Sequence, residues 1–231
     1  MIMGTQGVGK TSWCAAAEKP IFVQTEEGRG KLAISAFPLC RSYSNVIDCL
    51  TSLYREDHGY KTVVLDSLDW TERLVHERVR QEQGDDVFTN YGKGYVFAVP
   101  LFERLLKAFD ALRAKKQMTV LLAAHAQVKR FQSPDVEAYD RWELDLQAKS
   151  ASACEEWADA VLFANQRVYT KSTDAGFNRK QTRGVGEGER VLLTGERPSH
   201  SAKNRYGLPY ELPLDPTLGY RAVEKLIFGN V

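Results

Sequence analysis

A run of small and polar residues near the start of the chain, GTQGVGKTS (4–12), has the residue types and spacing needed to hold phosphate. Gly4, Gly9, Lys10 and Thr11 fit the pattern G-x-x-x-x-G-K-[ST]. Glycines allow a tight loop whose backbone N–H groups point at phosphate oxygens, Lys10 would reach the β- and γ-phosphates, and Thr11 would ligate Mg²⁺. We therefore expect these residues to bind a nucleotide: Gly4, Thr5, Gln6, Gly7, Val8, Gly9, Lys10, Thr11 and Ser12.

A second motif supplies the carboxylate that such a loop needs on a neighbouring strand. In TVVLDS, four largely apolar residues precede Asp66, which would stand at the carboxyl edge of a buried strand, where ligands collect in open α/β sheets. We expect Asp66 to hold the Mg²⁺ together with Thr11. Asp69 is better suited to capping the helix that follows. Only Met1–Met3 precede the loop, so either the leading strand is short or the start site trims it.

Hydrolysis also needs a group that orients the attacking water and one that senses the γ-phosphate. Glu26 and Glu27 end the strand after the loop's helix, and their position alone fits a water-orienting base and a surface turn equally well. The strand MTVLLAAHA leads to His125 and Gln127, both candidate sensors. Strand alternation places these two on one face and so does not separate them. A histidine satisfied inside the core is the alternative for His125.

The composition bounds the class of protein. The 231 residues, 43% of them apolar, are enough for one sizeable core, and we expect a single domain over 1–231. Lys and Arg number 31 against 30 Asp and Glu, so nucleic-acid binding has to come from local patches. The cysteines are far apart in the sequence and no stretch is apolar enough to span a membrane, which favours reduced thiols in a cytoplasmic protein without membrane contact. These cysteines are Cys14, Cys40, Cys49 and Cys154.

The order of elements indicates the architecture. Short apolar runs at 20–25, 61–67 and 118–126 alternate with helical patterns, which predicts a mostly parallel α/β sheet flanked by helices. We expect this core to end near residue 165 and a β-rich part to fill 166–231. That part contains candidate strands at RVYTK and RVLLTGER, predicted to form a β-hairpin extension, and a terminal helix at YRAVEKLI.

Two stretches are candidates for contact with nucleic acid. Residues 128–150 form a long polar segment without clear periodicity, with cations for phosphates and aromatic rings for unpaired bases, although acidic residues outnumber basic ones from 129 to 150, five to four. Residues 165–210 carry nine basic and four acidic side chains. A loop packed on a neighbouring subunit and a solvated face are the respective alternatives. The candidate residues are Lys129, Arg130, Phe131, Arg179, Lys180 and Arg183.

Taken together, the motifs GKT, TEEG, LDS and HAQ resemble the RecA-like P-loop ATPase core, in the compact form of phage-encoded single-strand annealing and recombination proteins. The resemblance implies that Glu26 is the catalytic glutamate and that 128–150 corresponds to the second DNA-binding loop. It also implies that AKNRYG is similar to the segment these ATPases offer to a neighbouring subunit's nucleotide. Lys203 and Arg205 would then act in trans.

The resemblance implies an ATPase that uses ATP and Mg²⁺, is stimulated by single-stranded DNA, and assembles head-to-tail into a ring or filament. It would act in recombination or annealing, in the bacterial cytoplasm if phage-encoded, with a phage or host single-strand-binding protein as a further partner. Three alternatives stay open. They are a P-loop nucleotide or small-molecule kinase, a helicase-loader-like ATPase, and an annealing protein that uses ATP only as a switch.

Overall fold

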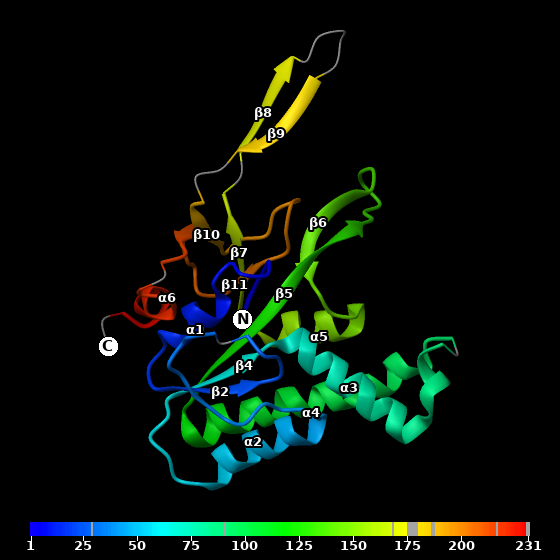
Figure 1. Ribbon diagram of the computed structural model, residues 1–231, viewed down its shortest axis with the longest axis vertical. Coiled ribbons are helices and arrows are strands. Elements are labelled where there is room, and N and C mark those ends of the chain that lie inside the picture. Colours follow the sequence, from blue (N-terminus) through cyan, green and yellow to red (C-terminus); the bar gives the residue numbers. More distant parts are fainter. Residues whose placement is uncertain are drawn as a thin grey trace.

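A mixed sheet forms the centre of the molecule, with helices on both faces (Figure 1). The computed structural model describes the chain except for residues 29, 90, 168, 175–179, 186–187, 216 and 230–231, and gives the backbone alone for 169–174 and 180–185. The strands of the main sheet are β1 (Ile2–Gly4), β2 (Pro20–Gln24), β3 (Ser35–Ala36), β4 (Thr62–Asp66), β5 (Thr119–Phe131), β6 (Tyr139–Leu144), β7 (Ala160–Gln166), β10 (Arg190–Leu193), β11 (Lys203–Asn204) and β12 (Glu211–Pro213).

Helices connect most of these strands, as the alternating sequence pattern predicts. They are α1 (Lys10–Ala15), α2 (Tyr43–Arg55), α3 (Leu68–Gln83), the 3₁₀ helix η1 (Asp85–Phe88), α4 (Lys93–Lys116), α5 (Ala148–Trp157) and α6 (Tyr220–Phe228). The strand order is β12-β10-β7-β1-β5-β4-β2-β3, and β7, β1, β5, β4, β2 and β3 run parallel. The mostly parallel α/β sheet expected from the sequence is therefore confirmed.

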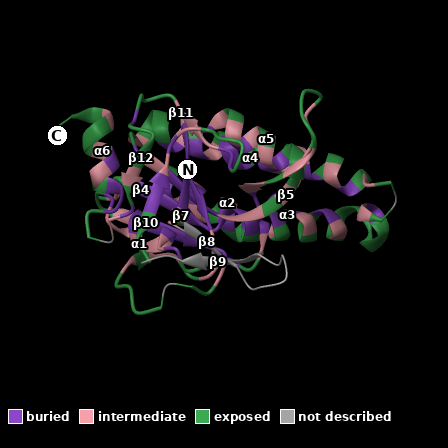
Figure 2. Ribbon diagram, turned by 90° about the horizontal axis from the view of Figure 1, so that it is seen from above, coloured by how far each residue is buried: buried purple, intermediate pink, exposed green. Residues whose placement is uncertain are grey.

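Alternation along the strands builds two cores. On β2 and β4, Val23 and Leu65 belong to the core cluster under α2–α5, whereas Phe22 and Val64 belong to the cluster under α1 and α6. Every one of these four side chains is fully buried. Figure 2 shows the buried residues gathered along the strands, with the outer helix faces exposed. Burial on both faces explains why these strands read as continuous apolar runs.

The register of the parallel strands brings their carboxyl ends to one edge. Gly4 of β1 lies opposite His125 of β5, and Gln24 of β2 lies opposite Asp66 of β4, which itself faces Ala123 of β5. Residues that follow β1, β2 and β4 therefore emerge together, beside His125. The topology assembles at this edge the motifs that lie far apart in the sequence.

The segment 128–150 differs from the expected irregular stretch. β5 continues to Phe131 and turns back as β6, an antiparallel hairpin with Phe131 opposite Tyr139, and α5 then begins at Ala148. Figure 1 shows this hairpin rising beyond the body of the sheet. Because much of the hairpin is solvated on both faces, its residues lack the strict apolar alternation by which a half-buried strand is recognised.

The β-rich part after residue 165 contains a hairpin, but only its first strand overlaps a segment expected to form it. β8 (Tyr169–Asp174) and β9 (Lys180–Val185) pair antiparallel as a separate two-stranded sheet. RVLLTGER instead supplies β10, which joins the main sheet against β7. None of the described helices is long and apolar enough to cross a membrane. The four cysteines are free thiols, with the Sγ atoms of Cys40 and Cys49 only 3.7 Å apart.

Candidate functional site

The loop between β1 and α1 depends on glycine at two positions. A Cβ on Gly4 would lie 2.4 Å from the carbonyl oxygen of Ala164, so a side chain there would collide with β7. Gly9 has φ +109°, a backbone conformation that L side chains rarely adopt, and its carbonyl accepts the N–H of Trp13 as α1 begins. The sequence therefore folds this segment into a cradle of bare backbone at the sheet edge.

Lys10 lies across the mouth of this cradle. Its side chain is buried, and its Nζ donates to the carbonyl oxygens of Gly4 (3.1 Å) and Thr5 (3.0 Å). Burial lowers the pKa of the ammonium, and the negative charges of Asp66, Asp69 and Glu26 oppose that fall. The side chain is thus held over the loop, facing three carboxylates, where a phosphate chain would add its own negative charge.

Thr11 and Asp66 meet as the sequence predicts. The Thr11 hydroxyl donates to Oδ2 of Asp66 over 2.8 Å, which joins the first turn of α1 to the end of β4. Burial raises the pKa of the Asp66 carboxyl, while the Thr11 hydrogen bond and Lys10 act against the rise. A hydroxyl and a carboxylate at this separation are hard oxygen ligands suited to Mg²⁺.

The donor set fits a metal that is shared with a nucleotide. Within the described residues, no group of three or more His, Cys, Asp or Glu side chains is arranged to hold a metal ion. A cation held by Thr11 and Asp66 would therefore take its other ligands from phosphate oxygens and water. That division of ligands is usual for Mg²⁺, which keeps several waters and binds through few carboxylates.

Hydrogen bonds between the ends of β2 and β4 bring Glu26 to the same edge. The Thr25 hydroxyl donates to the carbonyl oxygen of Ser67 (2.8 Å) and accepts the Ser67 N–H (3.1 Å), both buried. The next residue, Glu26, is partly exposed. Burial raises its pKa, and the nearby charge of His125 lowers it in part. Glu27 is exposed and forms a 3.8 Å ion pair with Arg41, so the two glutamates are distinguished by their surroundings.

His125 is fixed by a partner that the sequence motifs did not assign. Asp69, in the first turn of α3, accepts the backbone N–H of His125 at Oδ1 and contacts His125 Nδ1 through Oδ2, each over 3.0 Å. This pair holds the ring at the sheet edge, near Lys10 and Glu26. Asp69 looked like a simple helix cap because a first-turn aspartate is common for that reason alone. Only the fold brings it to β5.

The Asp69–His125 pair predicts a pH dependence of stability. The hydrogen bond to Asp69 raises the pKa of His125, and because burial acts against ionisation of Asp69, it is the bonds from His125 that lower the Asp69 pKa. Stabilisation by His125 is thus complete below its unfolded pKa of about 6.5 and is lost as the pH rises through the higher folded value. Stabilisation by Asp69 is lost in acid.

We expect the melting temperature of the wild type to fall from pH 6 towards alkaline pH more steeply than that of Asp69→Asn, in which the pKa of His125 returns towards its ordinary value. Thermal unfolding between about pH 6 and 9 measures this difference. Equal slopes for the two proteins would contradict the pairing. Glu82→Gln, which removes an exposed ion pair with Arg78, is the control for loss of one carboxylate.

Gln127 contacts a later segment of the chain, after β6. Its Nε2 donates to Oδ1 of Asp145, and the N–H of Asp145 donates to the carbonyl oxygen of His125. His125 is therefore the candidate at the site itself, and Gln127 lies on the link from β5 to the residues after β6. Both of the sensor candidates belong to one continuous strand.

The residues expected to contact nucleic acid have different surroundings. Lys129 donates to the backbone carbonyls of Leu144 and Leu146, so it is engaged within the chain. Arg130 forms an exposed ion pair with Asp140 over 3.4 Å. Phe131 packs against Tyr139, with the Arg141 guanidinium 3.9 Å above its ring. Of the other candidates, Arg179 lies outside the described residues, and the side chains of Lys180 and Arg183 on β9 are also outside them.

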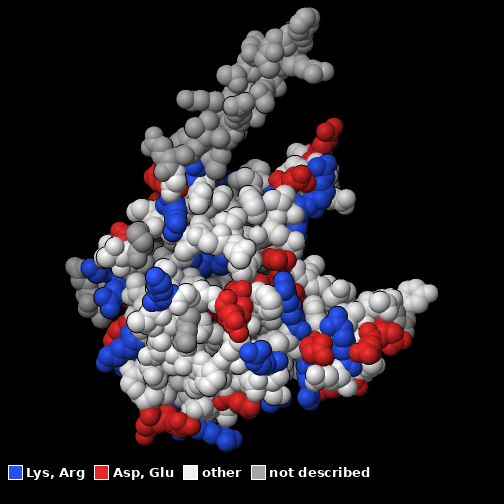
Figure 3. Space-filling view, viewed as in Figure 1, with Lys and Arg blue, Asp and Glu red and all other residues white. Residues whose placement is uncertain are grey.

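Charge on the visible face is mixed. In Figure 3, basic and acidic side chains alternate over the body and along the β5–β6 hairpin. This pattern agrees with the near balance of charges in the sequence. Binding of a polyanion at the hairpin would therefore depend on stacking and on a few cations rather than on a broad positive surface.

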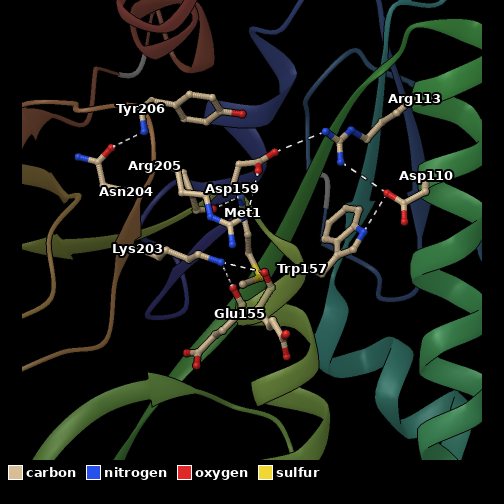
Figure 4. Close-up of polar contacts among 12 residues, drawn as sticks. Met1, Asp110, Arg113, Glu155, Trp157, Asp159, Lys203, Asn204, Arg205 and Tyr206 are labelled. Atoms are coloured by element: carbon tan, nitrogen blue, oxygen red, sulfur yellow. Dashed lines mark hydrogen bonds and ion pairs between the residues drawn. The ribbon is translucent and has the colours of Figure 1, made fainter.

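Lys203 and Arg205 lie at the opposite edge of the sheet from the loop. β11 pairs with the first residues of β7, Lys203 opposite Val161, whereas the loop lies at the far end of that strand, beside Ala164. Figure 4 shows both cations here. Lys203 Nζ donates to the carbonyl oxygens of Glu155 and Glu156, at 2.7 and 2.8 Å, and so caps the end of α5.

The Arg205 side chain is less engaged within the chain than that of Lys203. Its guanidinium forms a 3.3 Å ion pair with Asp159, which also faces Arg113 at 3.5 Å, and the Arg205 side chain is 55% exposed. Neither cation can serve the phosphate loop of its own chain from this edge. A cavity of about 190 Å³ also lies here, bordered by Trp13, Tyr206 and Tyr220, and is too small for a nucleotide.

Comparison with known proteins agrees with this geometry. A family model described as an AAA domain (AAA_24) matches residues 1–206, most of the chain. Among curated proteins, no match to the chain is found. The matched region spans the phosphate loop, Asp66, Glu26 and His125, and its sheet is the mostly parallel one expected of a P-loop domain. The chain therefore belongs to this AAA-domain family of P-loop ATPases.

Proposed function

We propose that this protein hydrolyses ATP with Mg²⁺ and is a RecA-like enzyme that acts on single-stranded DNA. The observation that carries the proposal is the meeting of Lys10, the Thr11–Asp66 pair, Glu26 and His125 at one edge of the sheet. These are the parts that phosphoryl transfer to water needs, because catalysis there is mostly positioning and charge stabilisation. A fold match alone would support ATP binding without saying how water is activated.

Each residue has a role that follows from its surroundings. Lys10 binds the β- and γ-phosphates, and Thr11 and Asp66 hold the cation, which neutralises charge that develops on the phosphate oxygens. Glu26 accepts a hydrogen bond from the attacking water and orients it. Burial raises the pKa of Glu26, which brings it towards the range that suits a base at neutral pH. His125, held by Asp69, senses the γ-phosphate.

Nucleotide state would reach DNA through β5. This strand carries His125 at the site and continues as one arm of the β5–β6 hairpin, whose far end holds Phe131 and Tyr139 with ring centroids 5.4 Å apart. Aromatic rings are suited to stacking on unpaired bases. The bonds from Asp145 to His125 and from Gln127 to Asp145 tie the base of the hairpin to the site. This continuity supports DNA-dependent hydrolysis.

Catalysis would be completed between subunits. Arg205 is exposed on the edge opposite the loop, so a head-to-tail neighbour could receive it in its own nucleotide site. An added positive charge on the transferring phosphoryl group is a recognised source of rate. Lys203, engaged at the end of α5, would support the segment that carries Arg205. Repetition of this contact gives a ring or a filament.

A mixing experiment tests the shared site. Arg205→Ala should lose about 100-fold in turnover while it keeps its ATP affinity, because the arginine stabilises charge only in the transition state. Lys10→Ala should be inactive because it binds no nucleotide, yet it still offers Arg205. Equal mixing of the two impaired variants should restore phosphate release to a level well above that of either variant alone. No recovery at concentrations at which the wild type assembles would contradict catalysis in trans.

The proposed function as a whole is tested by the rate of ATP hydrolysis with and without single-stranded DNA, alongside the mass in solution with a non-hydrolysable ATP analogue. We expect release of phosphate that rises with DNA, and a mass several times that of one chain. Transfer of phosphate to a nucleoside monophosphate would indicate a kinase instead. Tight ATP binding with DNA annealing but no hydrolysis would indicate that ATP acts only as a switch.

A further inference from the structure

Arg190 stands beside the phosphate loop, although no motif includes it. A Cβ placed on Gly9 would lie 3.3 Å from Nη1 of Arg190 and 4.0 Å from Cδ2 of Leu214. Arg190 is the first residue of β10, some 180 positions further along the sequence than the loop. The guanidinium therefore flanks the bare backbone at the point where the loop enters α1.

The position of Arg190 in β10 explains why its side chain extends towards the loop. Alternation puts Arg190 on the same face of β10 as Leu192, which is fully buried in the core cluster that contains Val8 and Leu214. The carbonyl of Arg190 accepts the N–H of Leu214 over 3.0 Å, which fixes the start of the strand. The Arg190 side chain therefore lies on the α1 side of the sheet, beside the loop.

The guanidinium has no partner in the described part of the chain. Glu189, the residue before Arg190, and Glu211 of β12, which lies opposite Leu193, both form ion pairs with Arg167. Within the described residues, Arg190 forms no ion pair and no side-chain hydrogen bond. Five donors in a planar fork, next to a loop built for phosphate, match the non-bridging oxygens of a phosphate group.

The order of the strands indicates which phosphate of a nucleotide Arg190 would contact. β5, β4 and β2, which carry His125, Asp66 and the approach to Glu26, lie on one side of β1, whereas β10 lies on the other side, beyond β7. The γ-phosphate belongs with the groups of the first side. Arg190 lies on the other side, beside Gly9, where the end of a phosphate chain away from the γ-phosphate would lie.

We propose that Arg190 binds the nucleotide, its guanidinium pairing with the α-phosphate. This inference rests on the proposed ATP site, and adds to it a contact that is the same for ATP and ADP. A surface arginine whose stem only covers Leu214 is the alternative, and it predicts no change in nucleotide affinity. Because Arg190 is exposed, its replacement should leave folding intact.

Equilibrium titration of the full chain with ATP and with ADP tests the proposal, with Mg²⁺ present. Arg190→Gln should weaken both affinities by a common factor of about ten, the size of one charge-assisted hydrogen bond. Arg190→Lys, which keeps one positive charge, should recover part of the affinity for both nucleotides. Arg55→Gln, which removes an exposed arginine at the end of α2, is the matched control and should bind as the wild type does.

Several outcomes would overturn the inference. Unchanged affinity of Arg190→Gln would reduce Arg190 to a surface residue, and a loss for ATP alone would place the contact on the γ-phosphate. An equal loss in Arg55→Gln would make the effect one of general charge. Failure of the underlying site would be different: the wild type would bind neither nucleotide, or Lys10→Ala would bind as tightly as the wild type. Thermal unfolding of each variant monitors folding.

Discussion

Replacing Lys10 with alanine should abolish ATP binding and reduce the catalytic efficiency of hydrolysis at least about 1,000-fold. The ammonium is buried, bridges the carbonyls of Gly4 and Thr5, and faces the carboxylates of Asp66 and Glu26. Its removal leaves the phosphate oxygens near two negative side chains without the cation that balances them. Titration with ATP and steady-state phosphate release measure the two losses.

The loss must be distinguished from unfolding, because Lys10 also bonds to the loop. Removing a buried donor costs about 1–3 kcal/mol through the carbonyls left unsatisfied, so the melting temperature should fall by several degrees without loss of cooperativity. Lys115→Ala, an exposed lysine stacked on Tyr54, is the control and should keep full activity. If Lys10→Ala is folded and still binds ATP like the wild type, the loop is not a nucleotide site.

Glu26→Gln should have the second largest effect, and it should act on turnover alone. An amide is isosteric with the carboxyl but cannot accept a proton, so we expect the rate of hydrolysis at saturating ATP to fall about 1,000-fold. Affinity for ATP should remain within a few-fold of the wild type, because Lys10 and the Thr11–Asp66 pair are intact. Single-turnover phosphate release together with ATP titration separates the two quantities.

Glu27→Gln is a closely matched control for this prediction. The neighbouring glutamate has the same chemistry, is exposed and forms only a surface ion pair with Arg41, so its replacement should change turnover less than twofold. Position in the sequence alone does not separate these two glutamates, and the resemblance to RecA-like ATPases implies Glu26. Loss of turnover in Glu27→Gln with full activity in Glu26→Gln would move the catalytic role by one residue and contradict the site described here.

The motif residues were predictable because each is defined by local spacing. Gly4, Gly9 and Lys10 lie within one short loop, and Asp66 follows an apolar run whose length marks it as a buried strand. The register of β1, β4 and β5 then brings them together, and this follows once the sheet is known to be parallel. Short-range pattern was sufficient to predict the sheet and to place Asp66 at the strand end beside Thr11, while its metal role stays a prediction.

The parts that the sequence did not reveal depend on tertiary contacts. From the sequence, Asp69 is expected to cap a helix, and only β5 brings the backbone of His125 to it. Lys203 is expected to act in trans, and only β11 shows its contact with the end of α5. Arg190 approaches Gly9 only because β10 returns beside β7. The β6 strand was missed because Asp140 interrupts the face on which Trp142 and Leu144 reach the core. Contacts between residues far apart in the sequence leave no local sequence pattern from which they could be predicted.

One edge of this sheet, we propose, forms an ATP-hydrolysing site that a second copy of the chain completes. The most direct measurement is phosphate release per chain from ATP and Mg²⁺, followed as the protein concentration is raised in the presence of single-stranded DNA. We predict a rate per chain that rises with concentration to a plateau and that is absent in Lys10→Ala. No release by the wild type at any concentration, or equal release by Lys10→Ala, would contradict the account.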